Sequence, residues 1–410
     1  MTAPAAFGTV LRAFRTAGGL TQEELAEGSG LSVRAIRNLE IGRTERPQRQ
    51  SVALLATALR LAEQDHAALL AAAGRGRAEQ GRSGRCELPP DVGELCGRDV
   101  VIAGLTSVLT GGGSRCVLVS GGPGTGRTAL AVHVAHRLRG GFPDGQLFAD
   151  LDEPGGGSMP VDAVLARLLR SLDVVDPPQT RDERAALVRA ELAARRVLVV
   201  LDNVAHESQV RPLLTGGGPS AVLITSRRDL VALPGVHPVR LDPLAADCAR
   251  RALWLIAGDR VRAEPEAARA IADACGRLPL ALHVAGAWLT AHPHRPLSDL
   301  AARLADDDLV LDRLAVADLS VRASIAAHVA RLRPDERRLL HQLAHVDSEV
   351  FTPAELSARL AVAEVSLCDD LDALTQANML TRQSAGYRMN PLVRRYAQED
   401  AGLPRLRAAR

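Results

Sequence analysis

The chain has 410 residues, of which 47% are hydrophobic; this is enough for buried cores and, at roughly 100–200 residues per domain, corresponds to about two to four domains. Its formal net charge is only +2, so the chain as a whole is not a polycation and any nucleic-acid surface must be local. Aromatic residues make up 2%, which argues against a platform that binds single strands by base stacking.

Six cysteines lack the C-x-x-C spacing of metal or redox sites, and we interpret them as reduced thiols. No signal peptide is found. The most apolar run, 278–289, is shorter than the roughly 20 residues that a membrane-spanning helix needs. We therefore expect a cytoplasmic location and no membrane partner.

Residues 1–72 predict an all-α helix-turn-helix domain. Thr21 followed by Glu24 predicts a capping box at the start of one helix, and Ser32 is the predicted N-cap of the next. The segment 19–47 resembles the phage-repressor (Cro/repressor-like, XRE) family, in which the second of these helices enters the major groove. We therefore expect double-stranded DNA as a partner and, because one such unit covers one half-site, a homodimer on DNA.

The resemblance assigns DNA contacts to residues on and around this second helix. Arg34 suits the two acceptors of guanine, Asn38 suits adenine, and Val33 suits a thymine methyl group. Gln22 matches a glutamine that contacts phosphate in the family. The complete set of candidate DNA-binding residues is Gln22, Ser32, Val33, Arg34, Arg37, Asn38, Arg43 and Arg46. A protein-interaction domain with a solvated arginine face is the alternative.

The most informative motif is 117–130, VLVSGGPGTGRTAL, which has the strand–loop–helix layout of a phosphate loop. Glycines allow successive backbone N–H groups to point at phosphate oxygens, and the N-terminus of the following helix adds partial positive charge. The candidate phosphate-binding residues are Gly121, Gly122, Gly124, Thr125, Gly126, Arg127 and Thr128. The motif therefore predicts a nucleotide-binding domain.

Two further elements predict a Mg²⁺ site and a phosphate sensor at the ends of buried strands. The apolar run 197–201 ends at Asp202, which together with Thr128 is the candidate Mg²⁺ site. The run 221–225 is followed by Arg227, a residue that can sense a terminal phosphate. Strands alternate with helices and predict a parallel α/β sheet, with strands at 146–151, 197–201, 221–225 and 237–241.

These motifs, in this order, resemble the NB-ARC class of STAND signalling ATPases, which includes bacterial antibiotic-pathway regulators. The entry motif h-G-R-x matches Cys96–Asp99, and the G-L-P-L motif matches Gly276–Leu280. The resemblance spans 96–401 and implies that the protein binds ADP or ATP. It places Arg98 near the nucleotide and Pro279 against its base.

Three positions depart from the family pattern. Arg127 replaces the phosphate-loop lysine in a chain without any lysine, and a planar guanidinium reaches phosphates differently from an ammonium group. Asn203 stands where many relatives have a second acid, and an amide cannot accept a proton from water. Asn390 stands where relatives carry a histidine that contacts the diphosphate. These changes favour nucleotide binding over hydrolysis, so enzyme activity is left undecided.

The resemblance also implies the order of domains. A flexible linker rich in glycine, arginine, serine and proline separates the helix-turn-helix domain from the nucleotide-binding domain. A helical domain, a winged-helix domain and a short tail follow. The predicted boundaries are 73–92 for the linker, 93–241 for the nucleotide-binding domain, 242–314 for the helical domain, 315–402 for the winged helix and 403–410 for the tail.

The sequence therefore predicts a transcriptional regulator that binds DNA and is gated by ADP or ATP with Mg²⁺, and the resemblance suggests a secondary-metabolite pathway. One alternative is a DNA-binding scaffold that is blind to nucleotide and keeps a vestigial phosphate loop. Another is a STAND ATPase that hydrolyses ATP to reset the switch. No repeat array is recognised after the winged helix, so we expect either that the signal enters through the nucleotide itself or that a separate sensor or a partner in the transcription machinery supplies it.

Overall fold

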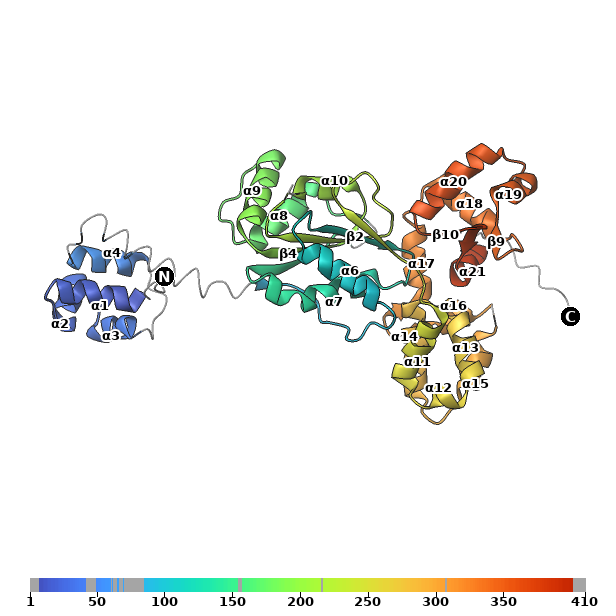
Figure 1. The fold of residues 1–410 in the computed structure, drawn as a ribbon, viewed down its shortest axis with the longest axis horizontal. Coiled ribbons are helices and arrows are strands. Elements are labelled where there is room, and N and C mark those ends of the chain that lie inside the picture. Colours follow the sequence, from blue (N-terminus) through green and yellow to red (C-terminus); the bar gives the residue numbers. More distant parts are fainter. Residues whose placement is uncertain are drawn as a thin grey trace. The chain divides into compact units, whose positions relative to one another are not determined.

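The computed structural model describes residues 7–41, 49–59, 61, 65, 69, 85–153, 157–214, 217–306 and 308–400. Contacts divide the chain into two units, one that holds the N-terminal helices and one that runs from Cys86 to the C-terminal helices. The described residues between 7 and 69 form helices and the segments that join them, and the larger unit contains a parallel sheet followed by many helices (Figure 1). The predicted fold class is therefore confirmed.

The smaller unit begins with four helices, α1 (Phe7–Ala17), α2 (Gln22–Ser29), α3 (Val33–Glu40) and α4 (Arg49–Ala58). The predicted capping box is confirmed, because the Glu24 N–H donates to Thr21 Oγ1 at 3.1 Å and the Thr21 N–H donates to Glu24 Oε2 at 2.7 Å. Ser32 also caps α3 as predicted, accepting from the Ala35 N–H at 3.2 Å. Both caps satisfy backbone donors that a helix start leaves without partners.

A small apolar core and one close helix contact hold these helices together. The core includes Leu11, Leu25, Ile36 and Leu55, all fully buried. Gly8 lies where α1 touches the end of α3, and a Cβ atom at this position would lie 2.4 Å from the Leu39 carbonyl oxygen. Only glycine therefore allows α1 to approach α3 so closely.

The larger unit is built on a six-stranded sheet with the strand order β1-β3-β4-β5-β2-β6. Strand β2 pairs in parallel with both β5 and β6, and β4 pairs in parallel with β5. The strands are β1 (Arg85–Cys86), β2 (Cys116–Gly121), β3 (Gly145–Asp150), β4 (Val197–Val204), β5 (Ala221–Ser226) and β6 (His237–Leu241). All four strands predicted from the sequence are confirmed, to within a few residues at their ends.

Helices cover both faces of this sheet, and successive strand residues point to opposite faces (Figure 1). Val117 and Val119 pack with α6 and α7, whereas Cys116 and Leu118 pack in the core that contains α8 and α9. The covering helices are α6 (Asp99–Thr110), α7 (Arg127–Arg137), α8 (Val161–Ser171), α9 (Arg181–Ala194) and the short α10 (Glu207–Val210). Burial on both faces explains why the strands are continuous apolar runs.

The linker predicted over 73–92 is wrong at its C-terminal end. Cys86 lies in strand β1, the Glu87 N–H donates to Gln146 O at 2.9 Å, and Leu88 packs against the core of the sheet. An edge strand needs backbone pairing but few apolar side chains, so its composition resembles that of a linker. The part of the linker before residue 85 lies outside the described residues.

The remainder of the larger unit shares one continuous apolar core. Its first helices are α11 (Ala246–Ala257), α12 (Arg260–Ala263), α13 (Pro265–Ala274), α14 (Pro279–Ala291), α15 (Leu297–Leu304) and α16 (Val310–Arg313), followed by the hairpin β7 (Ala315–Val316) and β8 (Leu319–Ser320). The C-terminal elements are α17 (Val321–Val329), α18 (Pro334–Ala344), β9 (Val350–Phe351), α19 (Pro353–Leu360), α20 (Glu364–Gln376), β10 (Leu380–Gln383), β11 (Gly386–Met389) and α21 (Pro391–Asp400). Strands β10, β11 and β9 form an antiparallel sheet in that order.

Among the described helices, none combines the length and apolar character that crossing a membrane requires.

Candidate phosphate-loop site and DNA-binding helices

The phosphate loop joins β2 to α7 and turns tightly at its glycines. Gly124 and Gly126 have φ angles of +72° and +86°, which favour glycine over residues with a side chain. Thr125 Oγ1 donates to Gly122 O at 2.8 Å and closes the turn. The Leu280 N–H, in the first turn of α14, donates to Gly124 O at 3.2 Å. A helix from a distant part of the chain therefore braces the loop.

Arg127 opens α7, and its guanidinium group turns back onto the loop. Its Nη1 donates to the carbonyl oxygens of Gly121 and Gly122, the latter at 2.6 Å. Burial is the main cause that lowers the pKa of Arg127 to about 10, with the nearby Arg227 as a second cause. The side chain stays charged at neutral pH, and two main-chain carbonyls compete with any phosphate for it.

Asp202 is a buried carboxylate near the end of β4, and the structure brings it against Thr128. Thr128 Oγ1 donates to the Asp202 carboxylate at 2.9 Å, and Thr225 Oγ1 donates to it at 2.5 Å. Burial raises the pKa of Asp202, although these two hydroxyl groups act in the opposite direction. Carboxylate and hydroxyl oxygens are ligands that Mg²⁺ prefers, so this pair fits that ion.

Asn203 follows Asp202 in a left-handed conformation, with φ of +57°. The backbone N–H of Asn203 donates to Thr225 Oγ1 at 3.0 Å, a hydrogen bond that proline could not make at this position. Its side-chain amide donates to Asp150 Oδ1 at 3.0 Å and to Asp202 Oδ2 at 3.2 Å. Asn203 therefore links two carboxylates at the carboxyl edge of the sheet and offers no group to take a proton.

Three other residues assigned to the nucleotide lie around the same loop. Arg98 Nη2 donates to Thr125 O at 3.3 Å, and burial lowers the pKa of Arg98. Pro279 is the first residue of α14, and its side chain would lie 3.9 Å from a Cβ atom at Gly126. Asn390 lies at the start of α21, where its Nδ2 donates to Gly276 O at 3.0 Å.

A narrow cavity lies beside the phosphate loop. The residues that line it include Gly122, Thr125, Asp242, Leu278, Asn378 and Asn390. The cavity has a volume of only about 30 Å³, whereas ligand pockets usually measure about 300–1,000 Å³. A nucleotide therefore needs the surrounding groups to move apart.

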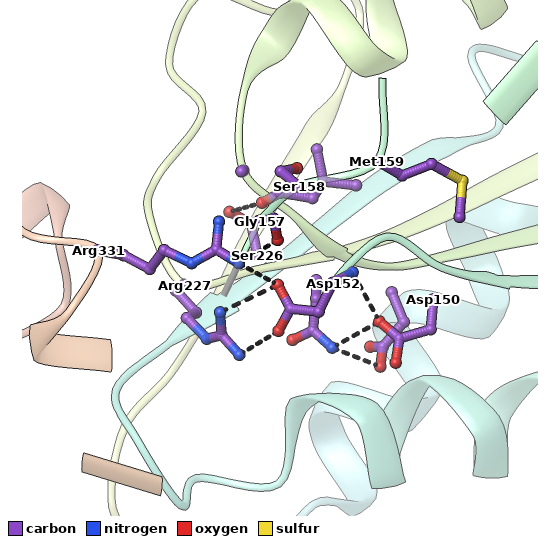
Figure 2. A network of polar contacts seen from close by, with 12 residues as sticks. Asp150, Asp152, Gly157, Ser158, Met159, Ser226, Arg227 and Arg331 are labelled. Carbon is purple, nitrogen blue, oxygen red and sulfur yellow. Dashed lines mark hydrogen bonds and ion pairs between the residues drawn. The ribbon is translucent and has the colours of Figure 1, made fainter. Parts of the chain in front are cut away.

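Arg227, the candidate phosphate sensor, is held by a carboxylate that follows β3. Arg227 Nη1 donates to Asp152 Oδ1 at 3.2 Å, and its Nη2 donates to Asp152 Oδ2 at 2.5 Å (Figure 2). Arg331, which follows α17, donates to the same Asp152 Oδ1 at 2.8 Å and to Gly157 O at 2.6 Å. One carboxylate thus bridges an arginine of the sheet domain and an arginine of the C-terminal elements.

A second ion pair joins the same two regions. Both Nη atoms of Arg228 donate hydrogen bonds to the Glu336 carboxylate, at 3.0 and 2.9 Å. The side chain of Glu336 is only 2% exposed and also accepts from Arg333 N at 2.8 Å. Asn378 adds a bond from its Nδ2 to Arg227 O at 3.1 Å.

Sequence reasoning missed Asp152, Arg331 and Glu336. A signal for Asp152 existed, because it lies directly after a predicted strand, at the edge where α/β sheets bind ligands. Arg331 offered no local signal, because it lies 179 residues from its partner in sequence. The capping position of Glu336 on α18 was readable, but its ion pair with Arg228 was not.

The smaller unit exposes most of the predicted DNA-reading residues that the structure describes. Val33, Arg34 and Arg37 are exposed on α3, and Asn38 is half-buried. Gln22 Nε2 instead donates to Glu40 Oε2 at 2.7 Å. Ser32 caps α3, and two further candidates, Arg43 and Arg46, lie outside the described residues.

Helix α20 is negatively charged, whereas α3 carries exposed arginines. Its exposed side chains include Glu364, Asp369, Asp370 and Asp372, and its thirteen residues include no basic side chain. Carboxylates repel DNA phosphates, so α20 is unsuited to lie against a duplex.

Comparison with known proteins identifies the N-terminal region first. Residues 6–69 match a family model described as a helix-turn-helix domain. Over 322 residues, 77% of the chain, the sequence is 40% identical to the regulatory protein AfsR of Streptomyces griseus, and it is 38% identical to its namesake from Streptomyces coelicolor over 327 residues. The chain spans 33% of the length of these relatives. A match of that extent includes the middle of the chain, with the phosphate loop.

Solved structures with a related architecture include a Walker-type ATPase of Pyrococcus abyssi (13% identity, TM-score 0.48, covering 76% of this chain and 99% of that one). A STAND protein with a tetratricopeptide-repeat sensor from Pyrococcus horikoshii is similar at 16% identity and a TM-score of 0.31, covering 78% of this chain and 44% of that one. Both likenesses are distant, and the assignment of the fold rests on the sheet itself. The recognition made from the sequence, a helix-turn-helix chain related to bacterial regulatory proteins, is confirmed.

Proposed function

We propose that this relative of the AfsR regulatory proteins is a DNA-binding transcriptional regulator whose central domain binds ADP or ATP with Mg²⁺. The observation that carries the proposal is the phosphate loop with Asp202 hydrogen-bonded to Thr128, in a chain with a helix-turn-helix domain. The helix-turn-helix domain binds a specific site in double-stranded DNA, and two copies of the chain bind as a dimer. The cell compartment that fits this role is the cytoplasm.

In this proposal the central domain is of the NB-ARC type and the C-terminal elements form a winged helix that closes over the nucleotide. The ion pairs of Asp152 and Glu336, together with the Asn378 bond, support such a closed arrangement. Because the exposed face of α20 is acidic, we assign DNA binding to the N-terminal domain and not to the winged helix. The order of helical and winged-helix domains, with boundaries at 242–314 and 315–402, belongs to the same proposal.

Different groups of the chain bind the phosphates and the Mg²⁺ ion of the nucleotide. Backbone N–H groups of the loop and the α7 N-terminus bind phosphate, and Thr128 and Asp202 hold Mg²⁺, which neutralises phosphate charge when bound. Asn203 bridges Asp150 and Asp202 and contributes no general base. We therefore expect hydrolysis to be weak or absent and exchange of nucleotide to be the switch.

The first test is to denature freshly purified protein and identify any released nucleotide by chromatography. Near-stoichiometric ADP or ATP supports the proposal. A protein that releases no nucleotide and binds neither ADP nor ATP on addition contradicts it and favours the nucleotide-blind scaffold. Magnesium-dependent release of phosphate from ATP at a rate that resets the switch favours the hydrolysing ATPase.

The Mg²⁺ site gives a further prediction. We expect Thr128→Ala to remove a ligand and a hydrogen bond to Asp202, and to weaken Mg²⁺-dependent nucleotide binding about tenfold. Nucleotide affinity is measured by titration calorimetry with Mg²⁺ and with a chelator. Thr110→Ala, on the exposed end of α6, is the control and leaves the affinity unchanged. Equal affinities of Thr128→Ala and wild type in Mg²⁺ contradict the metal role.

A prediction for DNA concerns Arg34, which is exposed on α3. We expect Arg34→Ala to cost about 1–3 kcal/mol of specific DNA binding and to relax the choice at one base position. The measurement is a binding assay over a library of operator variants at fixed salt concentration. Arg12→Ala, exposed on α1, is the control for loss of charge. Equal losses on all sequences would reassign Arg34 to a phosphate contact.

A further inference from the structure

The Asp152 carboxylate occupies the end of the Arg227 guanidinium group that Nη1 and Nη2 form. Both Arg227 Nη atoms donate to it, one to each oxygen, which is the bidentate geometry that a phosphate group also uses. The three side chains of Arg227, Asp152 and Arg331 are 19–24% exposed, so solvent screens them only in part. A terminal phosphate can bind this pair of Nη donors only after Asp152 has released them.

Among the side chains of Arg227, Asp152 and Arg331, the net charge is +1. Two arginines share one carboxylate, and Asp152 Oδ1 accepts from both of them. When Arg227 leaves, Asp152 keeps its bond to Arg331, so no carboxylate is stranded without a partner (Figure 2).

Hydrogen bonds hold Asp152 and the described residues Ser158 and Met159 in place. The Asp152 N–H donates to Asp150 Oδ1 at 3.1 Å, and Asp150 in turn accepts from Asn203. Gln209, buried beside the loop, donates to Ser158 Oγ and to Met159 O, both at 2.8 Å. A polar chain thus runs from Asp202 of the candidate Mg²⁺ site, through Asn203 and Asp150, to the backbone of Asp152.

We propose that Asp152 and Arg331 together set the preference of this site for nucleoside triphosphate over diphosphate. Asp152 competes with a terminal phosphate for Arg227, and Arg331 receives the Asp152 carboxylate when Arg227 is transferred to the phosphate. The inference rests on the proposed function, because it requires a nucleotide in the phosphate loop. It assigns opposite effects to two residues that touch the same partner.

The experiment measures the ratio of affinities for AMP-PNP, a non-hydrolysable analogue of ATP, and for ADP on the full chain in Mg²⁺. Asp152→Asn removes the competing charge, and we expect the ratio to rise about tenfold in favour of AMP-PNP. In Arg331→Gln, Arg227 is the one remaining arginine that pairs with Asp152. We therefore expect the ratio of AMP-PNP affinity to ADP affinity to fall by a similar factor. ADP affinity of each variant is the internal reference for a folded site.

Two further variants separate direct competition from a general effect of charge. Glu153→Gln removes the same charge one residue further along the loop, from an exposed side chain, and leaves the ratio at the wild-type value. In the double variant Asp152→Asn/Arg331→Gln, the effect of Arg331 disappears, because it acts through the Asp152 carboxylate. Asp152→Ser serves in place of Asp152→Asn if the latter does not bind ADP.

The outcomes are distinct. A wild-type protein that binds neither nucleotide overturns the proposed function, and the inference falls with it. A wild-type protein that binds both, with the same ratio in Asp152→Asn as in Glu153→Gln, overturns the inference alone. An Arg331→Gln effect that persists in the Asp152→Asn background also overturns it, since this marks a long-range attraction between Arg331 and the nucleotide.

Discussion

Gly8→Ala is expected to abolish most specific DNA binding without touching a DNA-reading residue. The added Cβ atom would lie 2.4 Å from Leu39 O and 2.7 Å from Glu40 O, both main-chain atoms at the end of α3. Overpacking of this kind costs about 1–3 kcal/mol, a large share of the stability of so small a unit. Because α3 carries the exposed residues Arg34 and Arg37, its displacement also misplaces the DNA contacts.

The matched control is Gly28→Ala in the same unit. A Cβ atom at Gly28 would lie 3.5 Å from Ala58 Cβ, an ordinary contact, and alanine in a helix is favoured over glycine by up to about 1 kcal/mol. We therefore expect Gly28→Ala to raise the melting temperature of the unit and to keep DNA binding. DNA binding by Gly8→Ala at the wild-type level would show that α1 and α3 leave room for a Cβ atom at Gly8.

Glu336→Gln is expected to destabilise the larger unit by roughly 3 kcal/mol. The carboxylate is 2% exposed and accepts from both Nη atoms of Arg228, and removing one partner of a buried ion pair leaves the other without compensation. Arg228 keeps some contact with water, which places the expected cost at the lower end of the range for buried pairs. Urea unfolding at pH 7 measures this difference from wild type.

The same residue gives a pH dependence. Burial alone would raise the pKa of Glu336, but its bonds to Arg228 and to the Arg333 N–H hold it below the ordinary value. Because the folded pKa is depressed, this stabilisation is fully present above about pH 4.3, the value of an unfolded glutamate, and is lost as pH falls through the folded pKa. The difference between wild type and Glu336→Gln should therefore shrink in acid.

Glu349→Gln is the control for this pair. Its side chain is 83% exposed and pairs with Arg388 at 3.1 Å, so we expect a change below about 1 kcal/mol with little dependence on pH. If the two variants have equal effects at pH 7, the Glu336 pair contributes no more than a surface contact.

The sequence predicted those parts of the fold that short, periodic segments determine. The strand–loop–helix around 121–126 was predictable because a buried strand, a glycine turn and a helix start are each local signals. The caps at Thr21 and Ser32 were predictable for the same reason. Strand β1 was missed because it has only two residues, both exposed, and therefore no apolar run.

Contacts between distant segments were beyond the sequence. Arg227 was singled out as a phosphate sensor, but its partner Asp152 lies 75 residues away, and Arg331 lies 179 residues from Asp152. The sequence shows that arginine replaces lysine at position 127, but it does not show the direction of the Arg127 side chain. The bonds of Arg127 to Gly121 and Gly122 could therefore not be predicted. Long-range pairing needs the relative placement of elements, and periodicity gives only their type.

The bridge between Arg227 and Arg331 has a consequence for whatever binds the C-terminal elements. Coupling free energy is reciprocal: if a triphosphate strengthens the bond of Asp152 to Arg331, then holding Arg331 in place must strengthen triphosphate binding by the same factor. A macromolecule that pulls Arg331 away from Asp152 acts as a diphosphate-favouring effector without touching the nucleotide. The nucleotide bound to the protein, diphosphate or triphosphate, would then depend on whether such a macromolecule can reach Arg331.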